Sequence, residues 1–261
     1  MSLVLKNLPI LVVLTPLMFS LIAAILPKPR HAWIIVNIAS FLTVIFSILL
    51  GIEVFENNII NYYLGNWPPP LGIEYVIDKV SIIPIFIIAV ISLLASLFAH
   101  NFFTTEIDDN LISKTYSLWL LAIAGLMGLV TTADAFNLFV FLEISSLSAV
   151  GLVAMGFKKD RKALVAGYNY LILGAVGATF YVIGVGLLYG LTGTLNMSDL
   201  AEKIPLLGAN KSVIVAFTFM ILGIMVKAAI YPLHIWLPNA YAYAPSPVSV
   251  LLAATATKVA I

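Results

Sequence analysis

Long stretches without a charged residue or a histidine recur along this chain, and they constrain its fold more than any other feature. Four of them, each 19 to 21 residues long, are bounded by Lys6 and Lys28, His31 and Glu53, Lys79 and His100, and Lys114 and Asp134. A helix needs ~20 residues to cross the hydrocarbon core of a bilayer, so each stretch matches one membrane span. The pattern predicts an all-α integral membrane protein whose chain crosses the bilayer repeatedly.

The composition excludes several classes of function. Of the 261 residues, 62% are hydrophobic and only 10% are charged, whereas soluble domains carry roughly 25% charged residues. So little charge cannot cover a globular surface, which excludes a soluble enzyme and a secreted scaffold. The formal net charge of +1 provides no field that would attract nucleic acid. Cysteine is absent, as are motifs for nucleotides, metals and nucleophilic catalysis, so we expect no cofactor, no metal and no catalytic chemistry on this chain.

After Asp134 the pattern changes, because charges now fall inside apolar segments. Four further spans are predicted, at residues 135–156, 164–190, 212–231 and 248–261. The last has only 14 residues, too few to cross the bilayer. We therefore expect further residues or a partner chain to supply a second half.

The spans divide into two predicted units. Residues 1–114 form a three-helix membrane unit, and residues 115–261 form a five-helix unit whose last helix is incomplete. With spans crossing alternately, the loops on one membrane face receive seven basic residues and those on the other face receive four. Because basic residues concentrate in cytoplasmic loops, we expect a multi-pass protein of the cell membrane with loop 157–163 in the cytoplasm and the N-terminus outside.

Two loops and one span carry further structural signals. We expect residues 56–78 to form an extended elbow around a Trp-Pro-Pro-Pro segment, and residues 196–208 to form a surface helix capped by Asn196 or Ser198. In the sixth span, Gly186 and Gly190 stand four residues apart, as do Gly174 and Ala178. Small residues at this spacing predict close helix packing.

Glu143 lies near the middle of its span, nine residues after Asp134. A charge at the membrane centre costs ~2.5–3.5 kcal/mol on insertion scales, so such residues are usually functional or paired. One interpretation is a permanent salt bridge or a neutral carboxyl. The other is a proton-carrying group that pairs with Lys227 and separates from it.

Lys227 begins a second polar set. On a continuous helix, Lys227, Tyr231 and His234 would share one face, but Pro232 falls among them and must kink or break the helix. A break at membrane depth is tolerated only beside protein or a wet cavity, so Lys227 and His234 make a candidate proton path. Lys258, inside the last apolar run, extends it.

The choice of lysine at these positions favours a proton relay. Arginine does not release its proton under biological conditions, whereas a desolvated lysine can. A glutamate and a lysine that approach and separate therefore act as a proton switch.

At these residues the sequence resembles the proton-pumping, antiporter-like membrane subunits shared by respiratory complex I and Mrp-type Na+/H+ antiporters. Within that group it is most similar to the D-type subunit of the Mrp antiporters and to its counterparts in membrane-bound hydrogenases. The resemblance is carried by residues 136–153 (FNLFVFLEISSLSAVGLV), 192–201 (TGTLNMSDLA) and 227–258 (KAAIYPLHIWLPNAYAYAPSPVSVLLAATATK).

The resemblance implies roles for four residues. Glu143 matches the fifth-helix glutamate of the family, Lys227 its seventh-helix lysine, His234 the histidine beyond the break and Lys258 the eighth-helix lysine, which together form a hydrophilic axis. The family fold has two inverted repeats, of which this chain supplies the first, with a broken seventh helix.

The resemblance also implies a function and partners. It suggests a proton-translocating subunit of a multisubunit Na+/H+ antiporter complex, surrounded by other membrane subunits and lipid, with H+ and Na+ as the transported ions. One alternative is a proton-pumping subunit of a redox-driven complex, such as a hydrogenase, a sulfur-reducing complex or NADH-quinone oxidoreductase, whose redox chemistry would belong to partners. The other alternative is a scaffold that transports nothing.

Overall fold

The computed structural model describes residues 3–208 and 210–261, and it is a bundle of long helices. Within this part of the chain, seven helices are long and apolar enough to cross a membrane. They are α2 (Leu8–Ile25), α3 (Pro29–Asn57), α4 (Ile82–Glu106), α5 (Asp109–Thr131), α6 (Ala135–Ala154), α7 (Lys162–Thr192) and α9 (Lys211–Ala228). A shorter apolar helix, α11 (Ser246–Ala260), follows them. The predicted all-α membrane fold is confirmed.

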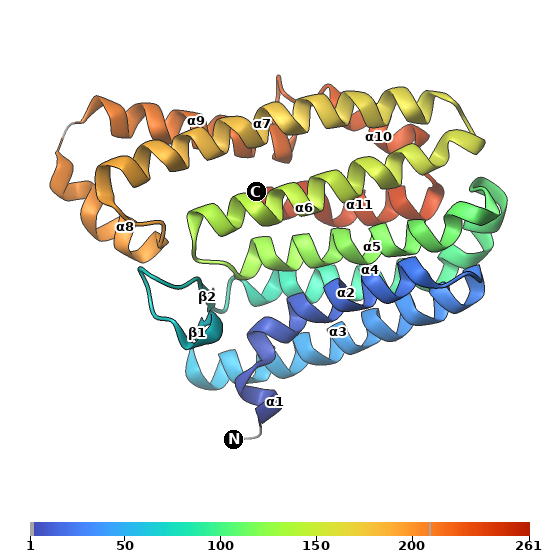
Figure 1. Cartoon of the computed structure of the whole chain (residues 1–261), viewed down its shortest axis with the longest axis horizontal. Coiled ribbons are helices and arrows are strands. Elements are labelled where there is room, and N and C mark those ends of the chain that lie inside the picture. The colour runs from blue at the N-terminus through green and yellow to red at the C-terminus, as the bar shows by residue number, and fades with distance from the viewer. Residues whose placement is uncertain (1–2, 209) are drawn as a thin grey trace.

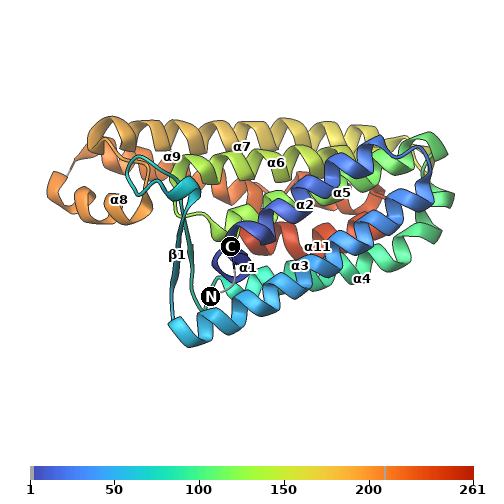
Figure 2. The same cartoon turned by 60° about the horizontal axis from the view of Figure 1, so that its bottom comes forward.

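The long helices run side by side along one axis, with α7 and α9 at one edge of the bundle and α3 at the other (Figure 1). Short elements join them: α1 (Leu3–Lys6), α8 (Met197–Lys203), α10 (Trp236–Tyr243) and the 3-10 turns η1 (Leu64–Asn66), η2 (Met155–Lys158) and η3 (Ile204–Leu207). Figure 2 shows that α8 and the strand segment lie at the same end of the bundle.

The seventh span is broken, as predicted, and the break follows from one proline. Helix α9 ends at Ala228, four residues before Pro232, and α10 begins at Trp236. A proline ring clashes with the carbonyl four residues earlier, so the helix stops at that residue. Ala229 then adopts the left-handed conformation, with φ of 54°. Because the helix stops here, Lys227, Tyr231 and His234 do not share a helix face.

The loop between α3 and α4 holds a two-stranded sheet that the sequence analysis did not predict. Strands β1 (Ile60–Tyr63) and β2 (Glu74–Ile77) pair antiparallel. Glu74 is buried there, and its carboxylate accepts a hydrogen bond of 2.8 Å from the side chain of Asn196. The same Asn196 caps α8 by accepting hydrogen bonds from Ser198 and Asp199 backbone N–H groups, which confirms the surface helix and its cap. The hairpin is thus fastened to the α8 region.

The opposite end of the bundle is joined by the carboxylate of Glu106, the last residue of α4. It accepts hydrogen bonds from the backbone N–H and the hydroxyl of Ser246, at 2.7 and 2.6 Å, at the start of α11. Lys159, in the turn between α6 and α7, forms an ion pair with it at 3.0 Å. Three segments far apart in the sequence therefore meet at this end.

Close packing of α7 on α9 depends on glycines other than those expected. Among the residues that the structure describes, a Cβ atom on Gly186 or Gly190 would meet nothing within 4 Å, so neither glycine lies at a contact between these helices. Gly177 and Gly184 face α9 instead, and a Cβ on Gly184 would lie 2.5 Å from the carbonyl oxygen of Ala216. The expected pair Gly186–Gly190 was wrong because spacing along one helix does not say which face meets a neighbour.

Candidate functional site

Lys227 is a buried cation in the last turn of α9, with only 5% of its surface exposed. Its Nζ atom donates hydrogen bonds to the hydroxyl oxygens of Ser146, at 2.6 Å, and Ser145, at 3.2 Å, both on α6. Neutral hydroxyls therefore solvate this ammonium group, and no carboxylate within the described residues lies in ion-pair contact with it. The Lys227 amine is therefore held by hydrogen bonds to neutral groups and not by an ion pair with a carboxylate.

Glu143 lies on α6, one turn before these serines, and is half-buried. Within residues 3–208 and 210–261, the ion pairs are Lys158–Asp108, at 4.0 Å, and Lys159–Glu106, at 3.0 Å, so Glu143 and Lys227 are not in ion-pair contact in this structure. Glu143 also lines an open cleft of about 430 Å³ beside α5. The permanent salt bridge considered for Glu143 is thus not formed here.

Two small cavities, each of about 10 Å³, lie between these charged groups. One is lined by Glu143 and the other by Lys227, and both are lined by Ser146, Tyr170 and Gly174. A third cavity, of about 70 Å³, extends from Lys227 to the end of α11. Glu143 and Lys227 therefore line two different cavities that share three residues, and the lining of both cavities is mostly apolar.

His234 and Lys258 lie elsewhere. His234 is half-buried in the segment between α9 and α10, where its ring packs against the 81%-exposed Tyr231 at 5.5 Å between centroids. Its Nδ1 atom is buried without a protein partner in the described part of the chain. Lys258 is exposed near the end of α11 and donates to Thr257 Oγ1 at 3.2 Å. Neither residue touches the pair of cavities between Glu143 and Lys227.

A second polar cluster lies at the hairpin end. Glu74 and Asp134 are buried there, with 6% and 7% exposed. Asp134 caps α6 by accepting a 2.7 Å hydrogen bond from the Asn137 backbone N–H, and burial raises the pKa of its carboxyl. Asp134 thus binds a donor of its own helix, whereas Glu74 binds the amide of Asn196 and so fastens the hairpin to the α8 region.

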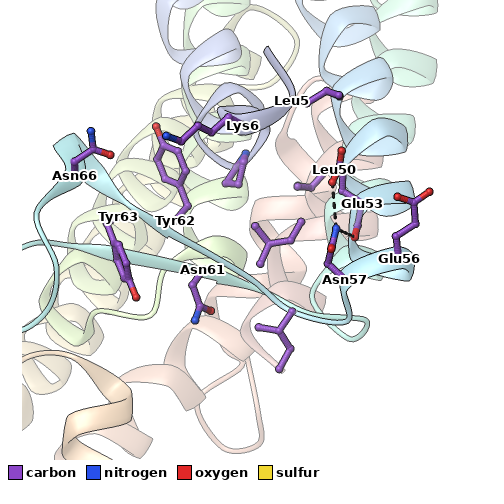
Figure 3. Close-up of a pocket in the computed structure, with 13 residues that line it drawn as sticks. Leu5, Lys6, Leu50, Glu53, Glu56, Asn57, Asn61, Tyr62, Tyr63 and Asn66 are labelled. Carbon is purple, nitrogen blue, oxygen red and sulfur yellow. Dashed lines mark hydrogen bonds between the residues drawn. The ribbon is translucent and has the colours of Figure 1, made fainter. Parts of the chain in front are cut away.

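A groove of about 800 Å³ opens at the same end, between the N-terminal residues, α3 and β1 (Figure 3). Glu53 and Asn57 are hydrogen-bonded in it, at 3.2 Å between side chains. The groove shares no lining residue with the cavities around Lys227. It is therefore separate from the cavities around the buried lysine.

The sequence analysis missed four residues of this site: Ser145, Ser146, Tyr170 and Trp236. A signal existed for Ser146, which stands three residues after Glu143 and so shares its helix face. Trp236 follows the helix break closely, but nothing in its spacing says that its ring enters the site. Tyr170 is one of four tyrosines in the α7 sequence, and only the packing of the helices shows which of them lies beside Lys227.

Comparison with known proteins gives consistent matches. Residues 132–261 match the model of a protein family that is described as "NADH:quinone oxidoreductase/Mrp antiporter, TM". NADH-quinone oxidoreductase subunit N of Desulforudis audaxviator is 41% identical over 97% of this chain and 50% of the relative. The D-type subunit of the Na(+)/H(+) antiporter from Bacillus subtilis is 32% identical over 97% of this chain and 51% of the relative.

A solved structure matches the fold as well. In the archaeal membrane-bound sulfane sulfur reductase, one chain superposes with a TM-score of 0.85 at 34% identity, covering 99% of this chain and 52% of that one. The chain thus spans about half the length of the relatives that it matches.

Proposed function

Since the chain belongs to the NADH:quinone oxidoreductase/Mrp antiporter family, we propose that it relays protons within a multisubunit membrane complex, through Glu143 and Lys227. The single observation that supports this most is the burial of Lys227 against two serine hydroxyls, with Glu143 lining a cavity that shares three residues with the cavity of the lysine. A lysine buried in this way can release its proton. When a carboxylate approaches, it stabilises the charged form of the lysine, which then takes up a proton again.

In this proposal the proton leaves Lys227 by one of two routes. Ser146 borders the route toward Glu143, and the cavity lined by Val259 and Ala260 borders the route toward α11. Lys258, exposed near the end of α11, is the proposed acceptor on the second route, and His234 in the helix break is a further proposed relay residue.

The driving reaction is a separate part of the proposal. We propose cation/proton antiport, which is supported by the antiporter relative from Bacillus subtilis. A redox-driven complex is the second candidate, because the NADH-quinone oxidoreductase relative shows the higher identity, 41%. In both cases other membrane subunits are the proposed partners, and any redox chemistry lies on them.

Proton movement in vesicles containing the purified complex distinguishes these candidates. Antiport predicts that an imposed Na+ gradient changes the internal pH without an electron donor. A redox drive predicts a pH change only with an electron donor, and iron–sulfur subunits among the co-purified chains. An intact complex that moves no protons under either condition would support the scaffold alternative.

We also propose an orientation in the cell membrane. Basic residues are concentrated at the end of the bundle that holds Lys158, Lys159, Arg161 and Lys162, opposite the hairpin and α8 (Figure 1). Because basic loops stay in the cytoplasm, this end is cytoplasmic and the hairpin and N-terminus lie outside.

Single cysteines introduced into the chain can report this orientation, because the chain has no cysteine of its own. Asn110→Cys and Arg161→Cys, both exposed, should react with an impermeant thiol reagent from the cytoplasmic side only. Leu71→Cys and Leu206→Cys, at sites 83% and 84% exposed, should react from the outside only. Labelling of Arg161→Cys and Leu206→Cys from one side would refute the arrangement.

A further inference from the structure

The segment that leads from α5 into α6, residues 132–135, is held from two sides by backbone hydrogen bonds. On one side, the N–H of Ala133 donates to the carbonyl oxygen of Glu74, on β2, at 2.9 Å. On the other side, the N–H of Ala135 donates to the carbonyl oxygen of Leu195, just before α8, at 2.8 Å. The segment therefore pairs with both neighbours as a short strand would, and α6 begins between the hairpin and α8.

The side chain of Asn196 closes this arrangement, and it is only 3% exposed. Its Nδ2 atom donates to the Glu74 carboxylate at 2.8 Å. Its Oδ1 atom accepts from the backbone N–H groups of Ser198 and Asp199, at 3.0 and 3.1 Å, and so caps α8. Its backbone pairs with that of Asp134, the N-cap of α6. One buried residue thus joins β2, the start of α6 and the start of α8.

Two hydrophobic clusters meet at this junction. The larger one contains the buried apolar residues of β2 and most of those in α2 to α5. The smaller one joins four helices, through Ala135 of α6, Tyr181 of α7, Leu200 of α8 and Ala216 of α9. Helix α6 begins in the smaller cluster and continues into the larger one, which includes Ala149. The bond between Asn196 and Glu74 therefore links the two clusters where α6 begins.

The start of α6 determines where Glu143 lies relative to Lys227. Glu143 follows Asp134 by nine residues on α6, which is about 13 Å along the helix axis at ~1.5 Å per residue. Lys227 belongs to α9, which packs closely on α7 where Gly184 meets Ala216. Because a helix moves largely as a rigid element, a shift at the start of α6 would move Glu143 relative to Lys227.

We propose that Asn196 is a positioning residue for the relay: by binding Glu74 it fixes the start of α6 against the hairpin and α8, and so sets the separation of Glu143 and Lys227. The inference rests on the function proposed for that pair. The Asn196 amide exchanges no proton with either group, and it acts only through the position of α6.

Asn196→Ser tests this, because serine is also a good N-cap but its hydroxyl is too short to reach Glu74. The variant keeps the cap of α8 and leaves a buried carboxylate without its amide donor, so α6 loses its attachment to the hairpin. Proton flux per assembled complex in vesicles should fall between about ten- and a hundredfold, since a misplacement of ~1 Å between reacting groups can cost about 10² in rate.

Asn210→Ser is the matched control. Asn210 caps α9 in the same way, by accepting from the Ser212 backbone N–H at 2.9 Å, and within the described part of the chain its side chain binds no acid of another element. The same exchange of residues at this second cap should leave the flux unchanged.

Exchanging donor and acceptor should restore the relay. In the double variant Asn196→Asp with Glu74→Gln, the introduced glutamine amide donates to the introduced aspartate, whose other oxygen still caps α8. Its flux should return to within about twofold of the parent rate, because 0.4 kcal/mol or less separates rates that are this close. Glu74→Gln alone should also keep the flux, because the glutamine carbonyl oxygen still accepts from Asn196. A double variant that assembles but stays as slow as Asn196→Ser would overturn the inference.

A distance measurement separates positioning from a general loss of stability. The chain has no cysteine, so spin labels can be attached at Leu147→Cys on α6 and Ile221→Cys on α9, two sites that are each 54% exposed. The distance distribution between the labels in the assembled complex should broaden or shift in Asn196→Ser and match the parent in Asn210→Ser and in the double variant. A variant that is merely less stable would yield less complex with the parent distance, and that result would overturn the inference.

The outcomes also separate this inference from the proposed function. If Glu143→Gln stops the flux while Asn196→Ser moves protons at the parent rate, only the role of Asn196 fails. If the parent complex itself moves no protons, the proposed function fails, whatever the distances between the labels.

Discussion

Proton flux should fall to the background rate when Lys227 is replaced by arginine, although the positive charge is kept. The buried site needs a group that releases its proton, and arginine does not. Glu143→Gln should have the same effect, because the amide keeps the shape of the carboxyl but cannot bind the arriving proton. A group that transfers protons typically contributes a factor of about 10² to 10⁴ in rate, so the expected loss is at least roughly a hundredfold.

The energy scale supports this expectation. Moving one charge through 100 mV is worth ~2.3 kcal/mol, which a change in the pairing of Glu143 and Lys227 can offset. A modest rearrangement of the pair can therefore pass a proton against a physiological gradient.

Flux is measured in vesicles with the assembled complex, and assembly is verified on a native gel. Lys211→Arg is the matched control, because Lys211 is exposed in the first turn of the same helix α9 and should tolerate the change. If Lys227→Arg and Glu143→Gln complexes assemble and move protons at the wild-type rate, the two residues are structural and the scaffold alternative is favoured.

Gly184→Val should destabilise the protein strongly, because α7 and α9 touch at this glycine. A Cβ on Gly184 would lie 2.5 Å from the backbone oxygen of Ala216 and 2.6 Å from Met220 Cγ, well inside van der Waals contact. The helices would have to move apart, and overpacking of this kind costs about 1–3 kcal/mol. We expect a lower melting temperature and less assembled complex.

Gly186→Val separates the contact from the general cost of a branched residue in a helix. Gly186 lies two residues further along α7, and a Cβ there meets nothing within 4 Å. Thermal unfolding of the purified protein in detergent should show a large shift for Gly184→Val and a small one for Gly186→Val. Equal shifts would mean that the close approach at Ala216 does not limit stability.

Much of the fold could be predicted from the sequence because its strongest determinants are local. A charge is excluded from the hydrocarbon core, so charge-free runs mark the spans. A proline disturbs its own helix, so Pro232 marks the break. The hairpin was missed because β1 and β2 have only four residues each and flank a proline-rich segment. The division of the chain at residue 114 stays a prediction.

The site could be predicted only in part, because its assembly depends on packing. Glu143 and Lys227 are conspicuous from the cost of burying a charge. The serines that bind the amine, and the cavities that separate it from Glu143, follow from how α6, α7 and α9 meet. The roles of His234 and Lys258 in a relay stay predictions, and Lys258 lies exposed at the surface of the bundle.

The end of α9 at Ala228 has an electrostatic consequence inside the membrane. The peptide dipoles of a helix add up to about half a negative charge at its C-terminus and half a positive charge at its N-terminus, an effect of about 0.3–1 kcal/mol on a nearby charge. Because α9 ends at Ala228, one residue after Lys227, its negative end lies in the turn that carries this lysine. An unbroken helix would carry its partial charges out to the two aqueous surfaces. The broken helix instead places the partial negative charge of its C-terminus inside the membrane, in the turn that carries Lys227.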